Sequence, residues 1–302
     1  MKKLIFALIT LSMIWGMSFL FIKVLVHDLG SVGVVFWRCF VGALTLWCIV
    51  LLKRSFVLKE FKKLPWKIII IVTIFNNVLP WILIAVSETK ISSSLASVIN
   101  ATTPIWTLII GIFFFRIKST IQKWIGLMVG FSGILFLLEF NITSILKENL
   151  IGIGTMLLAT ICYGLAGHIA QKRLHNISVM MLSVTTLTMA SLISFICLLF
   201  TSSIETFMNI FQMHVILSLI GLGVFGSGIA YLLYYYLVKE GSAEFASFVT
   251  YIVPMTAIIW GFILLKESIS FNMIIGLILV LMGVYLSTYK MKKLENEKKV
   301  TA

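Results

Sequence analysis

Charged and turn residues divide the chain into ten long apolar segments separated by short polar ones. The segments cover 3–24, 31–52, 67–87, 92–115, 121–139, 149–171, 178–200, 212–238, 243–265 and 271–290. Each is close to the roughly 20 residues that a helix needs to cross a bilayer. In lipid the backbone must satisfy its own hydrogen bonds, so continuous apolar runs of this length indicate helices rather than strands. The pattern predicts an all-α integral membrane protein with ten transmembrane helices.

The composition leaves little room for anything else. Of 302 residues, 60% are hydrophobic and 12% are charged, and the mean hydropathy is +1.10. A soluble domain is nearer to about half apolar and a quarter charged. Ten spans leave only short loops and tails, so no separate catalytic or nucleotide-binding domain fits. The function is therefore expected to lie within the membrane.

Basic residues gather on one side of these segments. Of the 24 Lys and Arg residues, the exceptions are Lys23, Lys90, Lys147 and Lys266 on the other side and Arg38 inside the second segment. The positive-inside rule then predicts a multi-pass protein of the plasma (inner) membrane with both termini in the cytoplasm. The same rule accounts for the net charge of +13 without any nucleic-acid partner. The basic loop over 53–67 and the basic tail are interpreted as lying beside an anionic leaflet.

The N-terminus begins with two lysines, as a signal peptide does, but its apolar run continues to about Leu25 without a small-residue cleavage site. It is therefore interpreted as an uncleaved first span. The cysteines show no metal-ligand spacing and are interpreted as core residues rather than disulfides. They are Cys39, Cys48, Cys162 and Cys197. No metal site and no cofactor are expected.

An internal repeat relates the two halves at a constant offset of 150 residues. It aligns Ala96 with Ala246, Ser97 with Ser247, Pro104 with Pro254, Gly126 with Gly276 and Gly133 with Gly283. A fixed register that includes two of only four prolines predicts two copies of one unit, over 1–140 and 149–290, before a basic cytoplasmic tail over 291–302. Each unit has five spans, an odd number, so the second copy enters the membrane from the opposite side. Inverted repeats of this kind are typical of secondary transporters.

Short motifs recur in order along both halves. The second half contains Gly228-Ile229-Ala230-Tyr231, Gly241-Ser242-Ala243, Ala246-Ser247, Pro254, Gly261, Leu265-Lys266-Glu267 and Gly276, and the first contains Trp15-Gly16-Met17-Ser18-Phe19, Lys23 and Arg38. With these motifs the chain resembles EamA-type members of the drug/metabolite transporter (DMT) superfamily over nearly its whole length. The resemblance implies ten helices in two inverted five-helix repeats, and movement of small polar or amphipathic metabolites, often outward. One departure is Arg116-Ile117-Lys118, where many members have a Gly-Glu pair after the fourth helix.

Polar side chains inside the apolar segments are expected to face protein or a cavity rather than lipid. In the fourth segment they recur at steps of three and four, on one helix face: Ser93, Ser97, Asn100, Thr103 and Thr107. Two interpretations stand, namely hydrogen bonds between helices and the lining of a solute path. Asn100 favours the path, because its amide has several hydrogen-bonding positions to satisfy.

The third and eighth segments supply a second group of candidates. Asn77 and Trp81 share a helix face, and the repeat aligns them with Ser227 and Tyr231. Aromatic faces beside amide groups suit a site that stacks an organic substrate and fixes it by hydrogen bonds.

In the sixth segment His168 and Gln171 share a face. His168 is either satisfied by its neighbours or a substrate contact or proton carrier, since imidazole titrates near neutral pH. Arg38 either binds an anionic group or snorkels toward the surface. The predicted substrate path comprises Trp15, Ser18, Asn77, Trp81, Ser97, Asn100, His168, Gln171, Ser227, Tyr231 and Tyr251. Close helix packing is predicted at Gly126, Gly130, Gly223 and Gly226.

These features predict a secondary transporter, independent of ATP, that moves a small metabolite or amino acid by alternating access, most simply as an exporter. Its partners are the lipid bilayer and a small-molecule solute, and the sequence does not indicate an oligomeric state. An uptake permease for a metabolite or vitamin is the alternative. A channel would more often show a filter or charged rings. An enzyme is not expected, because neither a phosphate-binding loop nor the common zinc-protease and serine-hydrolase motifs occur.

Overall fold

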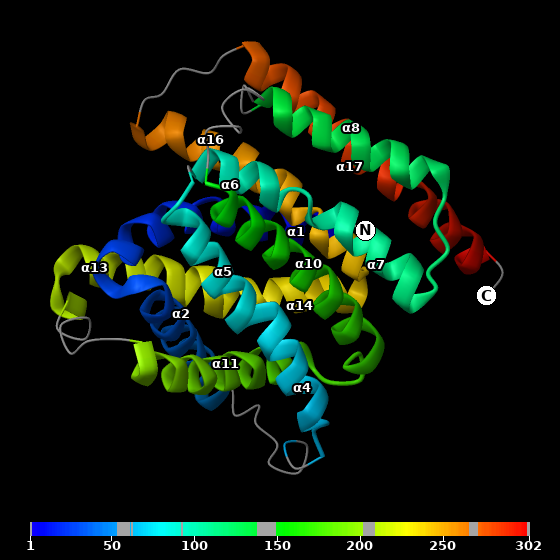
Figure 1. Cartoon of the computed structure of the whole chain (residues 1–302). Coiled ribbons are helices and arrows are strands. Elements are labelled where there is room, and N and C mark those ends of the chain that lie inside the picture. The colour runs from blue at the N-terminus through cyan, green and yellow to red at the C-terminus, as the bar shows by residue number, and fades with distance from the viewer. Residues whose placement is uncertain are drawn as a thin grey trace.

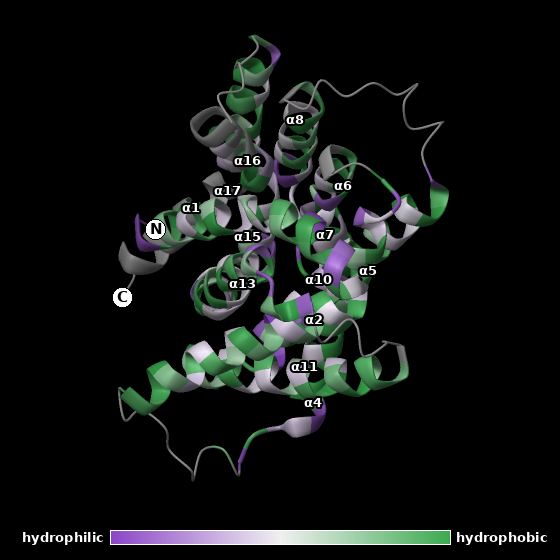
Figure 2. Ribbon diagram, turned by 90° about the vertical axis from the view of Figure 1, so that its left-hand side faces the viewer, coloured by the Kyte–Doolittle hydropathy of each residue, from purple (hydrophilic) through white to green (hydrophobic). Residues whose placement is uncertain are grey.

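The computed structural model describes residues 2–52, 61, 63–91, 93–137, 149–201, 209–265 and 271–300, and every regular element in these ranges is a helix. Six helical stretches are long and apolar enough to cross a membrane: Lys2–Leu52, Trp66–Glu88, Leu95–Phe115, Leu150–Arg173, Val179–Phe200 and Met213–Glu240. Shorter apolar helices cover Ile121–Phe136 and Phe271–Ser287. Hydrophobic residues predominate along the helices (Figure 2). The chain is thus an all-helical, multi-pass membrane protein. Lys147, Lys266, Glu267 and most of the basic 53–67 loop lie outside the described residues.

In the first half the described residues form seven α-helices and one π-helical stretch. These are α1 (Lys2–Gly16), α2 (Ser18–Leu52), α4 (Trp66–Thr73), η1 (Ile74–Val78, π), α5 (Leu79–Glu88), α6 (Ser93–Asn100), α7 (Thr103–Phe115) and α8 (Ile121–Leu137). The stretch from α1 through α2 has 51 residues, which is about 75 Å of straight helix and more than twice the hydrocarbon thickness. Gly30 interrupts it with φ 65° and ψ 168°, a conformation that side-chain-bearing residues rarely adopt.

The second half follows the same order. Its elements are α10 (Leu150–Arg173), α11 (Val179–Thr201), η2 (Asn209–Phe211, 3₁₀), α13 (Met213–Leu219), η3 (Ile220–Ile229, π), α14 (Ala230–Glu240), α15 (Ala243–Ser247), α16 (Val249–Leu265) and α17 (Phe271–Val300). Helix α17 continues past residue 290, where the apolar pattern ends. Its last turns are rich in lysine and glutamate, which are good helix formers.

Local sequence sets several helix ends. Asn149 caps α10, its side chain accepting hydrogen bonds from the backbone N–H groups of Ile151 and Gly152 at 2.9 and 3.3 Å. Helix α7 ends at Arg116, which has a left-handed conformation with φ 55° and ψ 38°. Glycine adopts this conformation most readily at a helix C-terminus. This chain therefore has a side-chain-bearing residue at a left-handed cap.

Helices of one half pack mainly on helices of the other. Helix α2 packs on α11 and η3, α10 packs on α5 and α7, α1 packs on α16 and α14, and α8 packs on α17; the last pair runs side by side at one edge of the molecule (Figure 1). Because α10 begins the second half as α1 begins the first, α1 corresponds to α10, α2 to α11, α5 to α14, α7 to α16 and α8 to α17. Exchanging the two halves therefore turns these contacts into contacts of the same kind. The two halves therefore interlock instead of forming separate domains.

Both halves contain a π-helical stretch at the same repeat position. The offset of 150 places η1, residues 74–78, on residues 224–228 within η3. A π-helical turn holds more residues than an α-turn, is rare, and is frequent at functional sites. Each half therefore departs from regular α-helix in the same place.

Close glycine contacts join α8 to α17. A Cβ atom added to Gly126 would lie 2.8 Å from the carbonyl oxygen of Gly283, and one added to Gly133 would lie 2.9 Å from the carbonyl oxygen of Gly276. The offset of 150 converts one of these pairs into the other. At Gly130 a Cβ would lie 2.5 Å from the Tyr251 ring. The helices approach so closely only because these positions lack side chains.

The other two glycines predicted for packing lie in η3. A Cβ at Gly223 would lie 2.7 Å from the Val41 side chain, and one at Gly226 would lie 3.1 Å from Ser18 Oγ.

The cysteines differ from expectation at one position: Cys39 and Cys162 are buried, Cys197 is half-buried, and Cys48 is exposed. The prediction that all four are core residues is therefore wrong for Cys48.

Replacing Gly126 by alanine tests the α8–α17 contact. The new methyl group would lie 2.6 Å from the backbone nitrogen of Ser287, so the helices must separate. We expect a loss of about 1–3 kcal/mol of stability, measured as a lower melting temperature in detergent. Gly154→Ala is the matched control, because nothing lies within 4 Å of a Cβ there. Equal melting temperatures for the two variants would contradict the expectation.

Candidate functional site

A cavity lies between the two halves, enclosing about 760 Å³ of space with its mouth included. Its wall draws on α1, α2, η1, α5, α6 and α7 from the first half, and on α10, α14, α15 and α16 from the second. The lining is mostly aromatic and aliphatic, with a few polar groups and one charged side chain. Such a lining is typical of sites for small organic molecules.

One amide fixes a cluster of three tyrosines beside this cavity. Asn76, only 1% exposed, donates through Nδ2 to the hydroxyl oxygens of Tyr231 and Tyr235 at 3.4 and 3.5 Å. Its Oδ1 accepts from Tyr234 at 3.1 Å, and its backbone carbonyl accepts from Tyr231 at 2.8 Å. A fully satisfied network of this kind makes a rigid wall.

Two tryptophans extend the wall. The Trp81 ring meets Tyr231 edge-on at 5.4 Å between centroids, and the Trp15 ring lies 5.9 Å from Tyr234. Trp15 also donates through Nε1 to the carbonyl oxygen of Gly226, in η3, at 3.0 Å. Residues from both halves thus form one continuous aromatic surface.

Among the described residues that line the cavity, Arg38 is the one with a charged side chain. The residue is 4% exposed, and its guanidinium carbon lies 3.7 Å from the centroid of the Trp81 ring. Its Nε donates to Ser227 Oγ at 3.1 Å, and that hydroxyl donates in turn to the carbonyl of Leu222 at 3.0 Å, within η3. Among the described residues no carboxylate forms an ion pair with this guanidinium.

The remaining polar groups of the lining differ in whether they are satisfied. The Thr103 hydroxyl donates to the backbone carbonyl of Asn100, the last residue of α6, at 2.6 Å, and the Thr107 hydroxyl donates to the carbonyl of Thr103 within α7 at 2.8 Å. Ser18 Oγ and Asn100 Oδ1, by contrast, are buried and have no hydrogen-bond partner within the described ranges. Buried polar atoms of this kind are costly unless a ligand or water satisfies them.

The cavity brings together five of the residues predicted to line the path: Trp15, Ser18, Trp81, Asn100 and Tyr231. Six others lie off the lining: Asn77, Ser97, His168, Gln171, Ser227 and Tyr251. Of these, Ser227 lies directly behind Arg38, and the Tyr251 hydroxyl donates to the carbonyl of Leu127 at 2.8 Å. Sequence analysis did not single out Asn76, Tyr163 and Tyr234, which line the cavity.

The π-helical stretch explains why Asn76 lines the cavity in place of Asn77. In an α-helix, residues four apart share a face, which pairs Asn77 with Trp81. In a π-helix the hydrogen bonds run from i to i+5 and each turn holds more residues, which shifts the register so that Asn76 lies on the cavity wall with Trp81. Asn77 is fully buried, and neither its Nδ2 nor its Oδ1 has a partner among the described residues.

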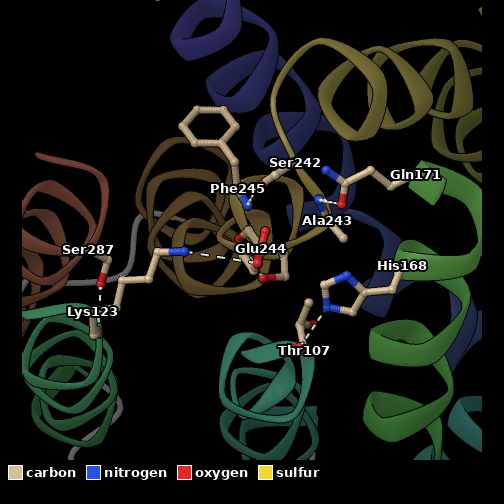
Figure 3. A network of polar contacts seen from close by, with 10 residues as sticks. Thr107, Lys123, His168, Gln171, Ser242, Ala243, Glu244, Phe245 and Ser287 are labelled. Atoms are coloured by element: carbon tan, nitrogen blue, oxygen red, sulfur yellow. Dashed lines mark hydrogen bonds and ion pairs between the residues drawn. The ribbon is translucent and has the colours of Figure 1, made fainter. Parts of the chain in front are cut away.

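A separate group of polar contacts surrounds the short helix α15 (Figure 3). Gln171 Oε1 accepts from the backbone N–H of Ala243 at 3.1 Å, and Lys123 Nζ lies 4.0 Å from Glu244 Oε1. The Ser242 hydroxyl caps the helix by accepting from Phe245 N at 3.0 Å. These contacts tie α8 and α10 to α15, which contributes Ala243, Ala246 and Ser247 to the cavity wall.

His168 lies in the same neighbourhood. Its Nε2 is 2.8 Å from the carbonyl oxygen of Thr107, and its ring stacks on Phe115 at 5.0 Å between centroids. The side chain is buried against α7 and has no place in the cavity lining. In this arrangement the histidine links α10 to α7.

An enclosed cavity with an aromatic and amide wall, shared between two interlocked halves of an all-helical membrane protein, defines a solute transporter. The sequence profile of the EamA-like transporter family matches residues 2–139 and 150–289. The chain belongs to this family, within the DMT superfamily, which comprises transporters and not enzymes.

Several relatives match over nearly their full length. The uncharacterized transporter YoaV of Bacillus subtilis is 24% identical over 289 residues, which are 96% of this chain and 98% of its own. An uncharacterized transporter of Archaeoglobus fulgidus is 26% identical over 290 residues, 96% and 100% of the two chains. Protein PagO of Salmonella typhimurium is 24% identical over 285 residues, 94% and 92% of the two chains. A solved crystal structure, 14% identical, shares the fold with a TM-score of 0.74 over 97% of this chain and 99% of its own.

The two adjacent asparagines provide a matched pair of variants. Asn76→Leu removes the partner of three buried tyrosine hydroxyls, so we expect a loss of about 1–3 kcal/mol and a lower melting temperature. Asn77→Leu replaces an unpartnered buried amide with an apolar group of similar volume, and we expect equal or higher stability. Thermal unfolding of the purified variants in detergent measures both. A larger loss for Asn77→Leu would contradict this assignment.

Proposed function

We propose that the protein is a secondary carrier that moves a small metabolite or amino acid across the plasma (inner) membrane by alternating access, with export as the net direction. The observation that carries this proposal is the cavity between the halves, whose wall is built from both. A carrier needs one site that each side of the membrane reaches in turn, and in repeat transporters that site lies at the interface of the repeats. Export is proposed because members of the superfamily often move solutes outward.

The helices support ten membrane crossings. Gly30 divides the long N-terminal stretch into two lengths that each suffice for one crossing. The other eight crossings are α4–η1–α5, α6–α7, α8, α10, α11, α13–η3–α14, α15–α16 and the apolar part of α17. The proposed units are 1–140 and 149–290, followed by the basic tail over 291–302. The two family matches, over 2–139 and 150–289, support this division.

The contacts also support a two-fold relation between these units. The Gly126–Gly283 contact corresponds to the Gly276–Gly133 contact under the repeat offset, and the π-helical stretches correspond as well. A two-fold axis relating units with an odd number of crossings lies in the plane of the membrane, so the units have opposite orientation. With the excess of lysine and arginine on one side, both termini are then cytoplasmic.

Breaks in two helices mark the parts of the site that change during transport. Helices α6 and α7 are separated at Ala101 and Thr102, and α15 and α16 are separated at Phe248. Both breaks lie beside residues of the cavity wall. Discontinuous helices at the midplane are where carriers of this type bind and gate their substrates. The substrate path therefore includes Trp15, Ser18, Trp81, Asn100 and Tyr231, with Ser227 behind Arg38.

A pair of tryptophan substitutions tests the carrier. Proteoliposomes loaded with a cellular metabolite extract are expected to show saturable counterflow of at least one solute, followed by mass spectrometry. Ala246→Trp fills the cavity wall and should reduce that counterflow at least about tenfold. Leu217→Trp, on the exposed face of α13, should leave it unchanged. Unsaturable flux, or equal flux through the two variants at equal melting temperature, would contradict alternating access through this cavity.

A pair of cysteines tests the inverted repeat. Lys90 and Glu240 are equivalent under the offset of 150, and both are exposed. In a background without the native cysteines, Lys90→Cys should react with a membrane-impermeant maleimide in intact cells. Glu240→Cys should react only after the membrane is permeabilised. Labelling of both from the same side would overturn the opposite orientation of the halves.

A further inference from the structure

The cavity wall holds one charge whose counter-charge is missing from the part of the chain that the structure describes. Arg38 is buried, lines the cavity, and contacts only Ser227 and the Trp81 ring through hydrogen-bonding or cation–π geometry. A charged side chain within a membrane protein is costly and is normally paired or placed on a substrate path. The arrangement therefore has a place for an anion that the described residues do not supply.

The two contacts of Arg38 leave a defined part of the guanidinium available. Trp81 covers the group at 3.7 Å and provides partial compensation of its charge. Ser227 occupies Nε. Among the described residues the two terminal nitrogens have no hydrogen-bond partner, and they form the planar edge that binds a carboxylate through two parallel hydrogen bonds.

The charge count limits the class of anion. Arg38 is the one charged side chain among the described lining residues, and it neutralises one negative charge. A phosphate monoester carries about 1.5 to 2 negative charges near neutral pH and would leave part of its charge uncompensated. A single carboxylate is balanced. The rest of the ligand must suit the apolar part of the wall, which includes Phe19, Ile22 and Val253.

A second buried polar group without a partner limits the class of ligand further. Asn100 lines the same cavity, and its Oδ1 is buried without a partner within the described ranges. An amide oxygen only accepts hydrogen bonds, so its partner must be an N–H or O–H group of the ligand. An amino acid and a hydroxy acid both supply a carboxylate together with such a donor.

We propose that Arg38 binds the carboxylate of a monocarboxylic solute with an apolar or aromatic body, and that Asn100 accepts a hydrogen bond from an amino or hydroxyl group of the same molecule. This inference rests on the proposed function, because it names the class of solute that the carrier cavity takes.

Thermal shift of the purified full-length chain in detergent tests the inference with defined probes. The carboxylate probes are L-phenylalanine, L-leucine and 3-phenyllactate, and the matched probes without a carboxylate are L-phenylalaninamide and 2-phenylethylamine. We expect millimolar carboxylate probes to raise the melting temperature and the matched probes to leave it unchanged. Whether phenylalanine or phenyllactate gives the larger shift distinguishes an amino donor from a hydroxyl donor at Asn100.

Variants locate the effect. Arg38→Gln should weaken carboxylate binding about 10- to 100-fold, since it removes charge-assisted hydrogen bonds. Arg38→Lys should retain part of the binding, because it keeps the charge and loses the two-pronged geometry. Arg173→Gln, at an exposed position in the last turn of α10, is the matched control and should bind as the wild type does.

Three outcomes would overturn the inference: no shift with any carboxylate probe, equal shifts with the carboxylate and matched probes, or an undiminished shift in Arg38→Gln. If Arg38→Gln does not fold, the comparison of probes on the wild type decides.

Counterflow separates this inference from the carrier itself. Counterflow of a solute without a carboxylate, unaffected by Arg38→Gln, would refute the carboxylate site and leave the carrier intact. Carboxylate binding without counterflow of any solute would refute the carrier and leave the carboxylate site intact.

Discussion

The structure depends on one constraint: within lipid, a polar group must find its partner inside the protein. Neither half of this chain meets that constraint alone. Asn76 lies on the first half, while the tyrosine hydroxyls that it bonds lie on the second. Arg38 likewise contacts Ser227 across the interface. The polar wall of the cavity therefore exists only when the halves are together, and the interlocked packing of α1, α2 and α10 on the opposite half follows from it.

The same constraint explains why irregular backbone is found at the cavity. A π-helical stretch changes which carbonyl groups are paired and which residues share a face. In η3 it presents the carbonyl of Gly226 to Trp15 and gives Ser227 an acceptor within its own helix. Such departures are tolerated at membrane depth only where protein or a cavity covers them. Their occurrence at equivalent positions of the two halves indicates that the site needs them, since a fold of regular helices would avoid them.

The sequence predicts the helical elements well and the site only in part. Apolar length and charged boundaries are local properties, so the predicted segment over 149–171 matches α10 (Leu150–Arg173), and the segment over 212–238 matches α13 to α14. Which residues share one face of a helix depends on the number of residues per turn, and the sequence does not reveal where that number changes. A period of 3.6 selects Asn77, whereas the π-helical stretch places Asn76 on the cavity. Tyr234 was missed for a related reason, because its role comes from a bond to a residue 158 positions away.

Residue type alone also does not show which polar side chains support the structure and which are available to a ligand. The difference depends on whether each side chain already has a hydrogen-bond partner. Thr103 and Asn100 lie three residues apart on the same face of the fourth apolar segment, yet the threonine hydroxyl is satisfied by a backbone carbonyl and the amide oxygen is not. A polar group that already has a hydrogen-bond partner gains little free energy from a ligand. A buried polar group without a partner gains a hydrogen bond that it lacks in the folded protein. By this criterion Asn76 and the tyrosines that it holds form the rigid wall, whereas Ser18 Oγ and Asn100 Oδ1 are buried without a partner among the described residues. In the proposed carrier these two groups and Arg38 would determine specificity, together with the shape of the aromatic wall.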